Sequence, residues 1–168
     1  SGWITTGPRT KELERRLAEY CHTSKTVCLN SATAAEELNF RICGIEPGDE
    51  VIVPAYTYTA SASAPIHCGA KVVFVDSQKD NCEMDYDKVA AITEKTKVVV
   101  AVDLGGIICD YDKLYAAIES KKHLFKAKEG NSLGARIQQA IGRVMVFADC
   151  AHALGANKEG KMAGEWAD

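Results

Sequence analysis

Five short apolar runs, rich in β-branched residues, are spaced along the chain. They lie at residues 26–29, 51–54, 71–75, 97–102 and 143–148. Their apolar positions are nearly continuous rather than alternating, which is typical of strands buried on both faces of a parallel sheet. The pattern therefore predicts strands of a parallel sheet at these five places.

Segments with helical periodicity separate most of these runs. The first opens at Gly7-Pro8 and places Leu13, Leu17 and Tyr20 on one face. The others lie at residues 31–43, 57–68, 86–92, 111–120 and 133–141. The polar, basic segment 121–131 predicts a loop or insertion. This alternation predicts an α/β fold with a mostly parallel sheet covered by helices.

Composition narrows the class of protein. With 168 residues and 46% hydrophobic residues, the chain can form one domain with a real core. No apolar run approaches the length of a membrane span and no leader segment opens the chain. Twenty basic and 23 acidic residues give a net charge of -3 without a basic stripe, so no nucleic-acid partner is expected.

The seven cysteines are odd in number and include no C-x-x-C pair. This favours free thiols in a reducing cytoplasm over a disulfide framework or a zinc site. We therefore expect a cytoplasmic protein with no metal site and no membrane partner.

Three of the predicted strands end on an aspartate, namely Asp76, Asp103 and Asp149. Ligands of open parallel sheets bind beyond the carboxyl ends of the strands. For Asp76 the favoured interpretation is the plain one, in which the acid caps the next turn. Asp149 is followed by small residues that leave room for a bulky group. Its carboxylate could hold a protonated ring nitrogen, the partner that a pyridinium needs to act as an electron sink.

A second candidate site is the turn at residues 28–38, where a predicted strand passes into a helix. Backbone N–H groups at the helix start, with the hydroxyls of Ser31 and Thr33, would suit a phosphate. The alternative is an ordinary N-cap, because Thr33 and Glu36 fit a capping box. A third candidate is the pair Tyr56 and Tyr58, which could stack on a flat ring but by themselves favour the core.

Five motifs stand in order along the chain: SGWITTGP at 1–8, NSAT at 30–33, GIEPGDEVIVP at 44–54, YTY at 56–58 and ADCAHA at 148–153. Together they resemble the DegT/DnrJ/EryC1/StrS family of pyridoxal-phosphate-dependent sugar aminotransferases. The resemblance covers nearly the whole chain. It implies the large domain of a fold-type I aminotransferase, in truncated form. The segment 121–131 is longer than the family pattern has at this place, which points to a subgroup of the family.

The resemblance implies a cofactor, pyridoxal 5'-phosphate, and a role for each matching residue. Asp149 would pair with the pyridine nitrogen and Tyr58 would stack on the ring. Ala32 and Thr33 would meet the phosphate, with Ser31 in the same turn.

Further roles follow from the same resemblance. His152 would lie near the phenolic oxygen of the ring as a catalytic residue; the alternative is a locally bonded, partly buried histidine. Trp3 and Ile4 would line the sugar pocket, and Asp103 would sit at its edge.

The lysine to which the family attaches its cofactor lies in a later segment than the match at residues 164–168. Lys158 and Lys161 precede that segment and are expected on an exposed turn. We therefore expect residues 1–168 to form part of a large domain, without the small C-terminal domain. Such a fragment would be inactive by itself, because it lacks the lysine that bonds the cofactor.

The resemblance implies an enzyme that transfers an amino group from glutamate to a nucleotide-linked keto-sugar, for polysaccharide or secondary-metabolite sugars. It also implies a homodimer with active sites at the subunit interface. Two alternatives stay open: a sugar dehydratase of the same family, in which a histidine replaces the lysine, and a non-catalytic fragment or binding module.

Overall fold

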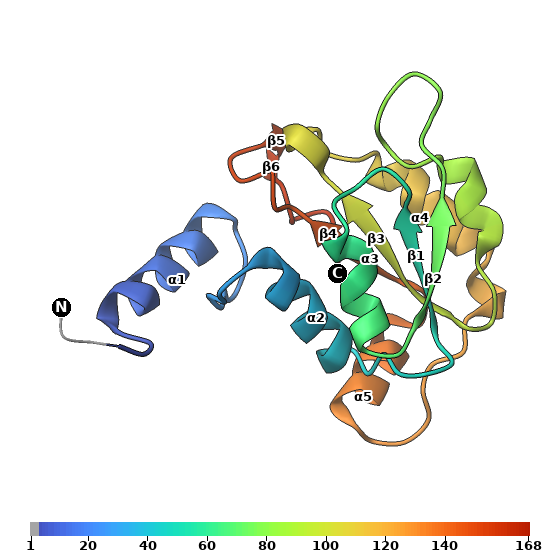
Figure 1. Cartoon of the computed structure of the whole chain (residues 1–168), viewed down its shortest axis with the longest axis horizontal. Coiled ribbons are helices and arrows are strands. Elements are labelled where there is room, and N and C mark those ends of the chain that lie inside the picture. Colours follow the sequence, from blue (N-terminus) through green and yellow to red (C-terminus); the bar gives the residue numbers. More distant parts are fainter. Residues whose placement is uncertain (1–3) are drawn as a thin grey trace.

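A computed structural model describes residues 4–168 (Figure 1). Along the chain the main elements are α1 (Pro8–Tyr20), α2 (Ala32–Ile42), β1 (Glu50–Pro54), α3 (Ala60–His67), β2 (Lys71–Val75), η1 (Tyr86–Ala91), β3 (Thr96–Val102), α4 (Tyr111–Ser120), α5 (Leu133–Ile141) and β4 (Met145–Asp149). Short 3-10 turns, η2 (Leu104–Gly106) and η3 (Lys122–Leu124), and a small hairpin of β5 (Asn157–Lys158) and β6 (Lys161–Met162) complete the described chain.

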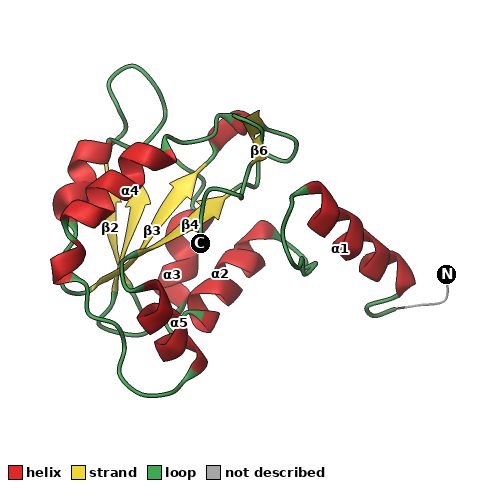
Figure 2. Cartoon of the chain, turned by 180° about the vertical axis from the view of Figure 1, so that it is seen from behind, coloured by secondary structure: helices red, strands yellow, loops and turns green. Residues whose placement is uncertain are grey.

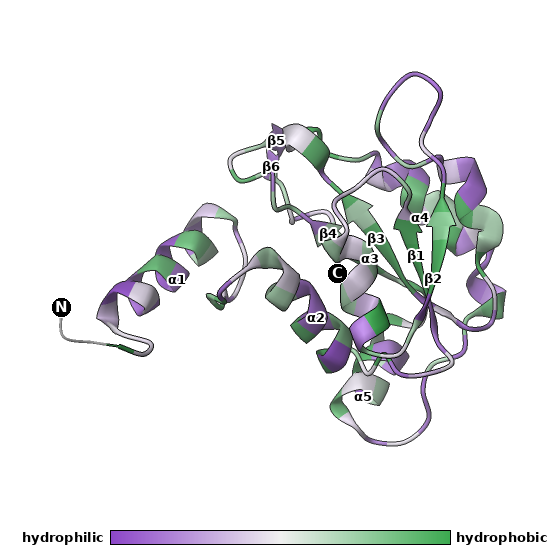
Figure 3. Cartoon of the chain, in the orientation of Figure 1, coloured by the Kyte–Doolittle hydropathy of each residue, from purple (hydrophilic) through white to green (hydrophobic). Residues whose placement is uncertain are grey.

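The four main strands form one parallel sheet in the order β2–β1–β3–β4. Its centre is strongly apolar: Val51, Ile52 and Val53 of β1 have no exposed surface. Figure 3 shows these strands as the hydrophobic middle of the molecule. The parallel sheet is therefore confirmed, at four of the five positions that the sequence predicted.

Helices cover both faces of the sheet (Figure 2). On one face Phe40 of α2 packs in a cluster with Val51, and α3 and α5 lie on the same side. On the other face Leu114 of α4 packs in a cluster with Ile52, beside η1. Consecutive strand residues point to opposite faces, so both sides of β1 are buried. This explains the continuous apolar runs of the sequence.

The predicted strand at residues 26–29 is not formed. The segment is extended but has no neighbouring strand, and Val27 and Leu29 remain 57% and 43% exposed. The backbone N–H of Cys28 donates to Glu14 Oε1 at 2.8 Å, where a strand would bond another strand. An apolar run alone does not supply the partner that a strand needs.

Residues 121–131 form the predicted loop, with one 3-10 turn inside it. The loop is held to α5, because the backbone N–H of Lys128 donates to Gln138 Oε1 at 2.9 Å. Gln138 is fully buried and also donates to the Cys43 carbonyl at 2.8 Å. One side chain thus joins the loop, α5 and the turn that follows α2.

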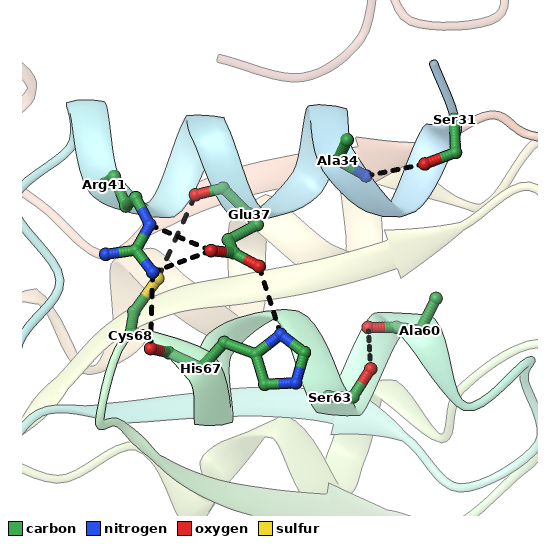
Figure 4. Close-up of polar contacts among 8 residues, drawn as sticks. All are labelled: Ser31, Ala34, Glu37, Arg41, Ala60, Ser63, His67 and Cys68. Carbon is green, nitrogen blue, oxygen red and sulfur yellow. Dashed lines mark hydrogen bonds and ion pairs between the residues drawn. The ribbon is translucent and has the colours of Figure 1, made fainter. Parts of the chain in front are cut away.

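Polar contacts fix the orientation of α2 on α3 (Figure 4). The Glu37 carboxylate accepts from Arg41 at 2.6 Å, one turn further along α2, and lies 3.0 Å from His67 Nδ1 of α3. At the start of α2 the Ser31 hydroxyl accepts from the backbone N–H of Ala34 at 3.1 Å. The contacts of Glu37 and Arg41 hold α2 against α3, while the Ser31 bond caps the start of α2.

Candidate active site

A pocket of about 200 Å³ lies where β1, β3 and β4 end and α2 begins. In the sheet, β2 lies on one side of β1 while β3 and β4 lie on the other, so the strand order reverses between β1 and β3. Open α/β sheets bind ligands at this switch point. The pocket is lined by Ala32, Thr33, Glu36, Thr57, Tyr58, Ala60, Val102, Asp103, Leu104, Asp149, Ala151 and His152.

Asp149, the last residue of β4, presents a held carboxylate to this pocket. Its Oδ2 accepts from the Ser61 hydroxyl at 2.9 Å, and its Oδ1 accepts from the backbone N–H of Ala151 at 3.1 Å. Thr57 Oγ1 lies 2.9 Å from Ser61 Oγ. Because Ser61 uses its one proton toward Asp149, it accepts the proton of Thr57. A carboxylate offers about four lone pairs, so two remain for further donors.

Glu36 brings a second carboxyl group to the same pocket. Burial, together with the neighbouring Asp149 carboxylate, raises the pKa of Glu36 to about 8. Its Oε2 is buried and has no hydrogen-bond partner among the residues that the structure describes. Two carboxylates this close do not both ionise easily, so Glu36 is mainly protonated at neutral pH and can donate a hydrogen bond.

The N-terminus of α2 also lines the pocket. Ser31 is the N-cap of this helix, so the alternative interpretation, a capping box with Thr33 as its cap, is wrong. Thr33 and Glu36 line the pocket instead. The first N–H groups of a helix, here those of Ala32 and Thr33, have no partner within the helix and favour an anion. A phosphate fits this end of the site.

The two tyrosines lie in the segment that joins β1 to α3. Tyr58 is 72% exposed and lines the pocket, while Tyr56 is 58% exposed. The prediction that they belong to the core is therefore wrong, because they stand beyond the strand end, where no other element covers them. Tyr58 offers its ring to the pocket. His152 is also exposed and lines the pocket, so it is not the buried, locally bonded histidine of the alternative.

Asp103 directly follows β3 and supports the pocket from inside. It is fully buried, and its carboxylate accepts from the backbone N–H of Cys109 at 3.0 Å and from the Tyr111 hydroxyl at 3.3 Å. Burial raises the pKa of Asp103. Its backbone N–H donates to the Asp149 carbonyl at 3.0 Å. Asp103 thus ties together the ends of β3 and β4.

Other predicted residues lie elsewhere. Ser31 is used as the cap of α2, and Ile4 is 99% exposed ahead of α1, away from the pocket lining. Trp3 lies outside the described residues. Asp76 accepts from the backbone N–H of Ser77, the next residue, at 2.9 Å and is not among the pocket-lining residues. A local role is therefore favoured for Asp76.

Lys158 and Lys161, which were expected on an exposed turn, make contacts outside the pocket. Lys158 Nζ donates to the Cys109 carbonyl at 3.3 Å, and Lys161 Nζ lies 4.3 Å from the centre of the Trp166 ring. Neither is among the pocket-lining residues. They sit on the β5–β6 hairpin.

Sequence reasoning missed Glu36 and Ser61. For Glu36 a signal exists: it stands four residues before Phe40, which is 1% exposed, so it lies on the buried face of the helix. A charged residue on the buried face of a helix is unusual, so its position indicates a specific role. For Ser61 no signal exists, because nothing in the run Ala60-Ser-Ala-Ser63 distinguishes Ser61 from Ser63.

Within residues 4–168 no cluster of three or more His, Cys, Asp or Glu side chains could hold a metal ion. No helix in this part of the chain has both the length and the apolar character needed to cross a membrane.

A parallel sheet covered on both faces, with an acid and a helix N-terminus lining one pocket at its switch point, is the large-domain architecture of fold-type I pyridoxal-phosphate enzymes. The chain belongs to the DegT/DnrJ/EryC1/StrS aminotransferase family, which matches residues 1–142. This establishes the resemblance that the sequence motifs indicated.

Two relatives are close over almost the whole chain. Spr1654 of Streptococcus pneumoniae, assigned as a sugar aminotransferase, is 56% identical with a TM-score of 0.93, over 100% of this chain and 42% of its own. It has been solved in its PLP-form, its PMP-form and its apo-form. The UDP-4-amino-4-deoxy-L-arabinose–oxoglutarate aminotransferase of Shewanella sediminis is 36% identical over 98% of this chain and 37% of its own.

A GDP-4-keto-6-deoxymannose-3-dehydratase shares the fold, with a TM-score of 0.77 at 22% identity over 97% of this chain and 39% of its own. This likeness concerns the fold alone. Against these relatives, the chain spans about two fifths of their length.

Proposed function

We propose that the chain forms the cofactor-binding part of the large domain of a pyridoxal-phosphate-dependent sugar aminotransferase. The observation that carries this proposal is the Asp149 carboxylate, held at the switch point with two free lone pairs in a pocket that the N-terminus of α2 also lines. The same pocket thus offers an acid and an anion site. A ring with a protonated nitrogen and a phosphate needs these two groups.

The pocket residues fit the cofactor in the following way. Asp149 would accept the ring N–H, and Tyr58 would stack on the ring face. Ala32 and Thr33 would bind the phosphate, and His152 would lie near the phenolic oxygen. When bound, pyridoxal phosphate supplies the electron sink for chemistry at the substrate carbon. The buried Ser61 hydroxyl, which donates to the half-buried Asp149 carboxylate, would keep this acceptor in place.

The substrate that we propose is a nucleotide-linked keto-sugar, with glutamate as the amino donor. The name of the Shewanella relative, which joins a UDP-linked amino sugar to oxoglutarate, supports this pair. Oxoglutarate is what remains when glutamate gives up its amino group. Trp3, Ile4 and Asp103 stay predictions for the sugar side of the site, and a cytoplasmic homodimer stays the expected form of the enzyme.

The remainder of the enzyme would supply the lysine that bonds the cofactor, together with the small domain. In this proposal residues 1–168 alone hold the ring and the phosphate but carry out no transfer, since neither Lys158 nor Lys161 lines the pocket.

The test uses the full-length protein, incubated with pyridoxal phosphate, glutamate and a panel of UDP-, GDP- and dTDP-linked keto-sugars. We expect the absorbance of bound cofactor, formation of an amino sugar and release of oxoglutarate. Absence of bound cofactor would contradict the proposal. Loss of a hydroxyl from the sugar without transfer of nitrogen would assign the dehydratase alternative instead.

A further inference from the structure

The described site contains one polar group that the proposed function does not use. Glu36 lies one turn into α2, on the same face as the buried Phe40, and its carboxyl group reaches the pocket beside Asp149. Its Oε2 is buried without a hydrogen-bond partner in the part of the chain that the structure describes. An unsatisfied buried polar atom costs about 1–3 kcal/mol, so a proton or a partner is expected here.

The Asp149 carboxylate can accept a hydrogen bond from such a proton. Asp149 already accepts from Ser61 Oγ and from the Ala151 N–H, one on each oxygen. Of its roughly four lone pairs two remain, one for a ring N–H and one for a further donor. A protonated Glu36 carboxyl group is that further donor. With it, each lone pair of the Asp149 carboxylate has a donor.

The surroundings of Glu36 favour its protonated form. Asp149, Asp103, His152 and Tyr58 are the titratable groups that line the same pocket from β3, β4 and the β1–α3 segment. Asp103 is turned toward Cys109 and Tyr111 and is satisfied there, so Asp149 is the carboxylate that acts on Glu36.

On α2 itself the adjacent acid points elsewhere. Glu37 is held by Arg41 and by His67 of α3 (Figure 4), which lowers the pKa of Glu37. Two neighbouring glutamates of one helix therefore have opposite electrostatic surroundings, and only Glu36 belongs to the pocket.

We propose that Glu36 is a positioning residue whose protonated carboxyl donates a hydrogen bond to Asp149 and holds it ready for the ring nitrogen of the cofactor. The link between Glu36 and Asp149 is independent of the cofactor; its use rests on the proposed function. The amide of a glutamine keeps the donor, whereas a leucine removes it.

The first experiment follows the carboxyl carbons of the cofactor-free, full-length protein by NMR with 13C-labelled glutamate. We expect Glu36 to titrate with a midpoint of about 8. In Asp149→Asn this midpoint falls, because the like charge is gone. Glu37→Gln, the matched control one residue further on, leaves it unchanged. A Glu36 midpoint near 4.5, or one that Asp149→Asn does not move, would overturn the proposal.

The second experiment measures binding of pyridoxamine phosphate, which needs no covalent bond to a lysine. We expect Glu36→Gln to bind within about twofold of the parent and Glu36→Leu to bind about tenfold more weakly, the fold-change of one ordinary hydrogen bond. The affinity of the parent protein for pyridoxamine phosphate changes as the pH passes about 8, where Glu36 loses its proton. The affinity of Glu36→Gln does not change there. Leucine binding as tightly as glutamate, or glutamine as weakly as leucine, contradicts a protonated donor.

The two experiments also separate the two proposals. If the parent protein binds no pyridoxamine phosphate, the proposed function fails, and the NMR titration still decides whether Glu36 donates to Asp149.

Discussion

At the scale of single residues, the central feature of the site is that only two donors of the described chain hold the Asp149 carboxylate. Ser61 and the Ala151 N–H fix its two oxygens, and the apolar residues of β4, such as Val146, carry the packing of the strand. The function of the carboxylate is therefore separable from the stability of the strand, and substitutions at position 149 can test it.

We predict that Asp149→Ala in the full-length enzyme leaves the fold intact and lowers turnover by about two to four powers of ten. The reason is that the protonated ring nitrogen of the bound cofactor would lose its charge partner, a loss of about 3–5 kcal/mol when the remaining charge is enclosed. Asp149→Asn is nearly as harmful, because an amide does not balance a pyridinium. The measurements are amino transfer and the absorbance of bound cofactor. Asp76→Ala, the control on an exposed acid, is mild; parental turnover in Asp149→Ala would refute this assignment.

The raised pKa of Glu36 also has a consequence for stability. The pKa of this carboxyl rises from 4.5 to about 8 on folding, so the folded protein binds the proton more tightly than the unfolded chain. Its stabilising contribution is full below pH 4.5 and is lost as the pH rises through 8.

We predict that, between pH 5 and about 8.5, the thermal unfolding midpoint of the cofactor-free parent falls relative to that of Glu36→Gln. Glu37→Gln serves as the control, since Glu37 is already ionised over this range. Parallel pH profiles for the parent and Glu36→Gln would contradict the raised pKa.

At the scale of elements, the strands that follow from the apolar pattern of the sequence were predicted correctly. What depends on a neighbouring element elsewhere in the fold was not predicted. The runs of β1 to β4 were found because both faces of each central strand are covered. The similar run at residues 26–29 has no strand beside it, and no local pattern reveals that. Only the family resemblance pointed to the pocket for Tyr58, which does line it, because an aromatic residue after a strand fits a core and a ligand site equally well.

A close approach between α2 and α5 also lies beyond sequence reasoning. Gly134 of α5 faces the turn after α2, and a Cβ there would come within 2.5 Å of Gly44 Cα. The backbones of the two segments meet because neither glycine carries a side chain. Gln138, one turn later on α5, bonds to the same turn through the Cys43 carbonyl.

We therefore predict that Gly134→Ala destabilises the protein by about 1–3 kcal/mol, although alanine favours helices, because α5 must move away from the turn. Denaturant unfolding measures this. Arg136→Ala, an exposed site on the same helix, serves as the control and changes stability little. A Gly134→Ala variant as stable as the parent would show that the two backbones separate at no cost.

At the scale of the whole molecule, α1 stands apart from the layered body in both views of the chain (Figures 1 and 2). It has no buried residue, and Leu13 and Tyr20 are each half exposed. Figure 3 shows hydrophobic stretches along this helix. With Val27 and Leu29 beyond it, this region exposes four large apolar or aromatic side chains, and such surfaces are often covered by a partner.

We predict that the full-length protein is a homodimer and that this apolar region lies at a covered surface. Light scattering at working concentration measures the mass directly. A stable monomer would count against the dimer, and the exposed face of α1 would then need another explanation.

The hydrogen bond from Ser61 to Asp149 joins residues 88 positions apart in the chain. The carboxylate that we assign to the ring nitrogen is therefore set in place only when β4 has paired with β3, so the site depends on contacts between distant parts of the chain. A ligand that binds this arrangement stabilises the folded state and not partly folded states. Cofactor should accordingly slow unfolding while leaving the refolding rate unchanged, so that the lifetime of the enzyme in the cell follows the supply of its cofactor.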